Sequence, residues 1–248
     1  DDVQAELYMD KEGRSNFDIF PKSDDDDTTK STFSLDSLPN IDLKKIKISN
    51  LDAHLLNVQG GMDATVDDFG LKVVGTLQTG MVDANIDIES GGIALAMVDS
   101  TGATTLAATL RDLGVELKGS GNLDAVDGKL KLKVKHATAK VGETDMVNTA
   151  LQESKHELLT LSAPFKADLR QMKIQLGESK LKLDNYALGF KGDVRLDPMA
   201  VDVALATDGA WQVEPLLKIV PEQFVSFAKD MDVDAKVELQ ATAVGTLT

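Results

Sequence analysis

The chain contains no cysteine and few aromatic residues. In 248 residues there are one Trp, two Tyr and eight Phe, so that aromatic side chains make up 4% of the sequence. Without cysteine, the chain can form neither disulfides nor thiolate metal sites, and this fits a cytosolic and a periplasmic protein equally. Any apolar core must therefore be built mainly from Leu, Val, Ile and Ala.

Positive charge and long apolar runs are also scarce. Lys and Arg total 26 against 41 Asp and Glu, which gives a net charge of -15. Such a chain repels nucleic acid and anionic bilayer surfaces, so we expect no nucleic-acid partner. No stretch approaches the roughly 20 apolar residues of a spanning helix. Because alternating apolar residues already occupy both ends of the sequence, we expect a section of a longer protein.

The sequence lacks recognisable catalytic and metal-binding motifs. The histidines His54, His136 and His156 are far apart, and His136 is expected on an exposed strand surface. There is no G-x-S-x-G elbow, no phosphate-binding P-loop and no G-x-G-x-x-G turn, because GSGN at residues 119–122 is followed by a strand pattern. Acidic pairs are abundant, but nothing singles one out as catalytic. We expect no enzyme activity, no cofactor and no metal.

What the sequence does contain is alternation of apolar and polar residues. In GKLKLKVKHATAKV (residues 128–141), Leu130, Leu132 and Val134 alternate with lysines. Side chains alternate across a strand, so this segment has one apolar and one cationic face. The pattern recurs along the chain, with turn residues about every ten positions. Turns are expected at residues 90–92, 100–102, 119–122, 176–179 and 197–198. The sequence thus predicts a mainly β protein, a long antiparallel meander forming a single curled sheet over residues 1–248.

Three segments depart from this pattern. Residues 214–229 (EPLLKIVPEQFVSFAK) have helical spacing, and Pro215 and Pro221 each suit a first helical turn, which predicts short proline-linked helices that cap an open sheet end. Residues 148–161 are expected as loop or helix. The polar residues 21–34, which include DDDD, predict an acidic variable loop; a calcium site is the alternative, but the spaced D-x-D-x-D-G pattern is absent.

The apolar face needs a partner, and the sequence leaves that partner open. Two such faces can cover each other in a sandwich, or one curled sheet can leave an apolar trough for a ligand. Burying aliphatic surface contributes roughly 25 cal/mol per Å² in both cases. The shortage of large aromatics favours a smooth surface that suits flexible acyl chains. The candidate groove-lining residues are Val82, Ile86, Leu95, Leu106, Leu130, Leu132, Val134, Ile174, Leu183, Leu188, Val203 and Leu205.

Two stretches resemble the AsmA family of bacterial envelope proteins. DKEGRSNFDIF (residues 10–20) is similar to the family's D-G-x-x-N-aromatic-D element but has a longer spacing from the acid to the glycine. The residues on matching positions are Asp10, Gly13, Asn16, Phe17 and Asp18. HLLNV (residues 54–58) stands where the family more often has Tyr-Asp. GDVRLDPMAVDVALATDGAWQVEPLLKIVPEQF (residues 192–224) is similar to its strand-strand-helix segment, with Leu216, Leu217 and Pro221 on the matching positions.

The resemblance implies a section of a curled β-sheet with an apolar groove, in a periplasmic protein anchored in the inner membrane. Its relatives include TamB and bridge-like lipid transfer proteins, so phospholipid or another acyl-chain lipid is the implied partner. Lipid transport between membranes would support outer-membrane biogenesis. Two alternatives stay open: a structural sandwich or adhesin-like domain, and an assembly factor that binds outer-membrane protein strands at a sheet edge.

Overall fold

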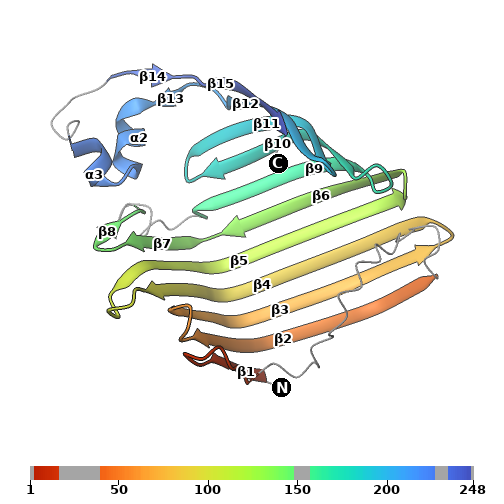
Figure 1. The fold of residues 1–248 in the computed structure, drawn as a ribbon. Helices are drawn as coiled ribbons and strands as arrows, with labels where there is room; N and C mark the ends of the chain where they lie inside the picture. The colour runs from red at the N-terminus through yellow and green to blue at the C-terminus, as the bar shows by residue number, and fades with distance from the viewer. Residues whose placement is uncertain (1–2, 17–39, 148–156, 227–233, 247–248) are drawn as a thin grey trace.

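The computed structural model describes residues 3–16, 40–147, 157–226 and 234–246 (Figure 1). Within these residues one 13-stranded sheet runs in the order β1-β2-β3-β4-β5-β6-β9-β10-β11-β12-β15; off this path, β7 pairs with β5, and β8 pairs with β7. A separate two-stranded sheet joins β13 to β14. Because most neighbours in the sheet are also neighbours in sequence, the predicted mainly β meander is confirmed. Figure 1 shows the sheet bending over from β9 onward without closing into a barrel.

The strands differ greatly in length. The main-sheet strands are β1 (Val3–Met9), β2 (Ile41–Asn57), β3 (Met62–Gln78), β4 (Met81–Val98), β5 (Thr104–Asn122), β6 (Ala125–Val134), β7 (His136–Val141), β8 (Thr144–Asp145), β9 (Leu159–Asp168), β10 (Lys173–Leu183), β11 (Tyr186–Leu196), β12 (Met199–Thr207) and β15 (Gln240–Thr246). The remaining elements are β13 (Trp211–Gln212), α2 (Val213–Ile219), α3 (Glu222–Val225) and β14 (Lys236–Val237).

The first strand departs from the antiparallel prediction. β1 pairs with β2 in parallel, with Val3 opposite Leu51 and Met9 opposite Asn57. A parallel neighbour requires a long connection, and here residues 10–40 separate the two strands. The sheet is therefore mixed at this edge and antiparallel elsewhere.

The turn after β1 covers the outer edge of that strand. The Asp10 carboxylate accepts hydrogen bonds from the backbone N–H groups of Glu12 and Arg14, both at 2.9 Å. The Asn16 side chain then accepts a hydrogen bond from the Tyr8 N–H at 2.8 Å and donates one to the Glu6 carbonyl at 2.9 Å. Unpaired backbone groups on an edge strand invite other strands, so this asparagine blocks part of the edge.

Strands β4, β5 and β10 extend past turns that the sequence predicted, because some of those predicted turns lie inside strands. Residues 90–92 continue β4 and residues 176–179 continue β10, so those predicted turns are wrong. Residues 119–122 complete β5, and the chain turns just beyond them. Turns at residues 100–102 and 197–198 are confirmed.

A line of unusual backbone conformations crosses the long strands. Asn50 in β2, Asp68 in β3 and Asp112 in β5 have φ values of 55°, 53° and 52°. The β3–β4 and β4–β5 registers place Asp68 and Asp112 on either side of Gly91. Beyond β5, the Lys135 N–H donates to the Arg111 carbonyl at 3.1 Å, between β6 and β7. We call the line Asn50, Asp68, Gly91, Asp112 and Lys135 the crease.

At the crease the apolar alternation shifts by one residue. In β5, Leu106, Ala108 and Leu110 alternate before it, whereas Leu113, Val115 and Leu117 alternate after it. In a regular strand this shift would move the second set to the opposite face. Left-handed residues re-aim the chain, and Asn and Asp tolerate that conformation better than most. Since neighbouring strands shift on the same line, the apolar residues stay on one side of the sheet.

The C-terminal helical prediction is confirmed where the structure describes it. α2 and α3 occupy residues 213–219 and 222–225, and Pro221 separates them. Residues 227–229 lie outside the described residues, as does the predicted acidic loop at 21–34. The segment 148–161 is only partly described, and its last three residues belong to β9 rather than to a loop or helix.

A left-handed aspartate at the crease can be tested by substitution. We expect Asp112→Val to lower the free energy of unfolding by about 1–2 kcal/mol, because a β-branched side chain is strained at this φ. Asp112→Gly is the matched control: it also removes the 3.7 Å ion pair with Lys135 but accepts the conformation. Urea unfolding of both variants measures the difference, and equal stability would contradict the strain.

Candidate functional site

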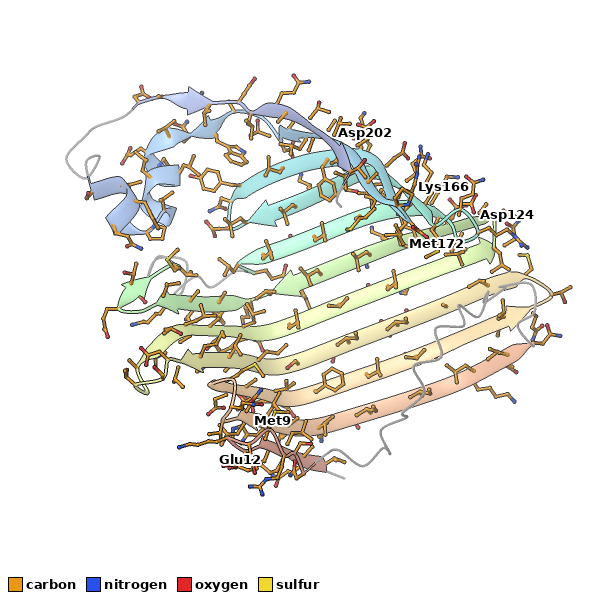
Figure 2. The ribbon with its side chains drawn as sticks, viewed as in Figure 1. Met9, Glu12, Asp124, Lys166, Met172 and Asp202 are labelled. Carbon is orange, nitrogen blue, oxygen red and sulfur yellow. The ribbon has the colours of Figure 1, made fainter. Side chains whose placement is uncertain are left out.

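Cross-strand pairing assembles the apolar residues into rows. Leu132 pairs with Leu161 and Leu161 with Leu181, which in turn pairs with Leu188. In the other direction Leu132 pairs with Val115. Residues directly opposite each other in a sheet point to the same face. Figure 2 shows that the side chains over the viewer-facing side of β3 to β6 are almost entirely carbon.

The registers bring the candidate lining residues into rows of this kind on both sides of the crease. Val82 and Ile174 belong to one row, connected through Gly121, Val126 and Ala167. Further rows hold Ile86 with Leu130, Leu132 with Leu188, and Val134 with Leu183. Val203 and Leu205 pair with Gly192 and Phe190. Beyond the crease, Leu95 pairs with Ala108 and Leu106 with Met97.

These residues are covered only in part. Val134 is 3% exposed and Leu183 is 39% exposed, while the other candidates are half-buried. The inner residues of a sandwich would be buried against a second layer. Among the described residues no second sheet covers this face, since the only other sheet is the two-stranded β13–β14. The apolar face is therefore open over most of its described extent.

Sequence reasoning missed several residues of the same face. Val126, Ala163 and Ala167 are among the most buried apolar residues, at 6%, 4% and 6% exposure. The Phe165 ring lies over Gly128, where a Cβ would come within 2.3 Å of the ring. A signal for these residues was present, since Ala163, Phe165 and Ala167 alternate along β9. Pro164 obscured this signal, because it stands between Ala163 and Phe165 where the alternation would have a polar residue.

The opposite face of the sheet is charged and held by ion pairs. Glu116 accepts a hydrogen bond from Lys131 at 2.8 Å and also pairs with Lys118. Hydrogen bonds from Lys118, followed by those from Lys131, lower the pKa of Glu116 to about 2. Lys166 pairs with Asp127 at 3.0 Å. Such exposed pairs contribute little individually, but they show which face lies in water.

A hollow that the sequence did not indicate is lined by many charged residues and also by Val115, Leu132 and Leu161 of the apolar rows. Its volume is about 520 Å³, and it lies across β4, β5, β6, β9 and β10. Lys131, Lys133, Lys180 and Lys182 line it together with Glu116 and further carboxylates. Because both signs of charge are mixed there, the hollow does not select an anion or a cation.

His54 connects the first three strands on the polar side. Its Nδ1 lies 3.0 Å from a Glu6 carboxylate oxygen of β1, and its Nε2 lies 2.9 Å from a carboxylate oxygen of Asp63 on β3. Hydrogen bonds to Asp63 first and to Glu6 second raise the pKa of His54 above its usual value of 6.5. When protonated, the imidazole adds ion pairs from β2 to both β1 and β3.

The remaining titratable groups form no site of their own. Among the described residues, no three His, Asp or Glu side chains gather closely enough to hold a metal ion. His136 is half-buried rather than exposed, and its Nδ1 has no hydrogen-bond partner in the part of the chain described. None of the described helices combines the length and apolar character needed to cross a membrane.

Comparison with protein-family models, with curated proteins and with solved structures gave no match. The AsmA resemblance therefore stays a prediction that rests on the two sequence stretches.

The His54 bridge predicts a pH-dependent contribution to stability. Because the folded-state pKa is raised, the contribution is complete below pH 6.5 and is lost as the pH rises through the folded-state value. We expect the melting-temperature difference between the native chain and His54→Gln to shrink over that range. Differential scanning calorimetry at a series of pH values measures it, and a difference that is unchanged or grows with pH would contradict the bridge.

Proposed function

We propose that the apolar face binds the acyl chains of phospholipid or a similar lipid and that lipids move along it. One observation carries the proposal. Rows of aliphatic residues lie on one open side of a single layer, and most of these residues are only half-buried. Exposed apolar surfaces beyond a few hundred Å² generally serve a ligand or partner. Each methylene removed from water contributes roughly 0.8 kcal/mol, so acyl chains suit such a surface.

The physical character of the face also supports movement. Aliphatic contacts are non-directional, and successive rows such as those of Leu130 and Leu132 offer chemically similar positions. A lipid passing from one row to the next exchanges equivalent contacts while its headgroup stays in water. This mechanism uses binding alone and requires no catalysis, cofactor or metal.

The biological setting of the proposal comes from the AsmA resemblance. The resemblance supports a periplasmic section of an inner-membrane-anchored protein, with membranes at the ends of the full-length molecule. Transport of lipid toward the outer membrane is the corresponding role. The net charge of -15 is consistent with a solvated outer wall.

An edge of the sheet favours strand augmentation as a second candidate function. β15 pairs with β12 on one side, and all its residues are exposed. Its sequence, QATAVGT, has neither the charges nor the proline that protect many edges. An assembly factor would add an extended strand of an outer-membrane protein there.

Leu132→Asp separates the two functions. The substitution puts a charge in the row of Leu161 and Leu181, and we expect lipid uptake to fall at least about tenfold because the carboxylate resists transfer into acyl chains. Native mass spectrometry detects co-purified phospholipid, and a fluorescent fatty acid measures uptake.

Lys129→Asp is the matched control. It puts the same charge on the polar face of the same strand, where Lys129 is exposed, and uptake should persist. Normal lipid binding by a folded Leu132→Asp chain would show that the assigned face is wrong. Crosslinks to unfolded strand peptides that survive this substitution would support augmentation instead.

A further inference from the structure

The single tryptophan of the chain packs on the end of the apolar face. Trp211 in β13 meets Tyr186 edge to face, with ring centroids 5.2 Å apart and planes inclined at 72°. Tyr186 is 9% exposed and begins β11. It pairs with Leu183, which pairs with Leu159. Trp211 therefore lies on the apolar side, at the row that begins with Val134.

Residues 211–225, comprising β13, α2 and α3, extend from this aromatic pair to the other side of the crease. We call them the strap. The Gln223 side chain in α3 donates a hydrogen bond to the Asp145 carbonyl of β8 at 2.6 Å. Figure 1 shows the strap between the upper strands and β8, away from the long strands β2 to β4. It covers one end of the face and leaves the rest open.

The indole nitrogen of Trp211 lacks a hydrogen-bond partner within the part of the chain that the structure describes. Its Nε1 is buried and has no hydrogen-bond acceptor among the described residues. Buried tryptophan N–H groups usually find a partner, and an exception in an otherwise apolar site calls for an explanation. A single N–H donor beside aliphatic side chains matches a ligand that joins one acceptor oxygen to a hydrocarbon chain.

Charge at this end narrows the class of acceptor. Asp184 lies close enough to Tyr186 to contribute, after burial, to the raised pKa of the phenol. The nearby Asp208 donates its backbone N–H to the Ala187 carbonyl, and its carboxylate is paired with Lys180. The negative field of Asp184 repels a phosphate or a free carboxylate more strongly than an ester carbonyl, which has no net charge.

We propose that Trp211 is a polar anchor of the groove, whose indole N–H binds the ester carbonyl of an acyl glycerolipid. The inference rests on the proposed lipid-binding function and adds a preference for ester-linked chains. The first methylenes after the carbonyl lie along Leu183 and Leu159, and the far end of the chain points away from the strap. The ring contact with Tyr186 must loosen to admit the carbonyl.

Because Trp211 is the only tryptophan, its fluorescence reports on ligands at this position alone. The native chain is titrated with phosphatidylcholine vesicles brominated either at carbons 6 and 7 or at carbons 11 and 12 of one acyl chain. We expect stronger quenching by bromine near the carbonyl. Stronger quenching by the distal bromines would overturn the placement.

Ester preference is measured separately by native mass spectrometry with diester and diether phosphatidylcholine. The native chain should favour the diester about fivefold, as expected for one net hydrogen bond. Trp211→Phe keeps an aromatic ring against Tyr186 but removes the donor, so it should bind both lipids equally, with circular dichroism checking its fold. Equal binding of both lipids by the native chain overturns the anchor but leaves the proposed function standing. Absence of any lipid overturns both.

Discussion

The continuity of the apolar face depends on a conformational constraint at the crease. Strands such as β5, which has 19 residues, can present one chemical face along roughly 60 Å only if their alternation is maintained or corrected. Here the alternation changes phase, and left-handed backbone at Asn50, Asp68 and Asp112 corrects it on one line. If a single strand shifted alone, leucines would enter the lysine-rich face. Because these strands are paired side by side, all of them must change their alternation at the same line.

Because its apolar face is half open, the sheet gains less stability from buried apolar side chains than a sandwich does. The most buried apolar residues gather where β6 meets β9, around Val126, Ala163 and Ala167, and at the start of β11. Elsewhere the continuous ladders and cross-strand pairs hold the layer together. Side chains also serve the backbone at the crease: the Ser90 hydroxyl lies 2.9 Å from the Asp67 and Gly92 carbonyls, and Asp52 accepts from the Asp68 N–H at 2.8 Å.

The period-two alternation was enough to predict the meander, and helical spacing with two prolines was enough to predict the short helices, because both depend on local pattern. It did not predict that residues 90–92 continue a strand, since Ser-Gly-Gly also suits a turn. The three-residue step from Leu110 to Leu113 indicated a change of alternation within β5. Only the strand register shows that the changes in neighbouring strands lie on one line. The parallel pairing of β1 and the Trp211–Tyr186 contact depend on tertiary position, which local pattern does not encode.

The two borders of the described sheet are unequal. On β1, Asn16 occupies backbone groups of Glu6 and Tyr8 that another strand would need, whereas β15 presents uncharged residues and no comparable cover among the described residues. A layer built this way has a direction of growth. Added strands would pair with β15 and lengthen the aliphatic rows on that side, whereas Asn16 hinders pairing along part of β1.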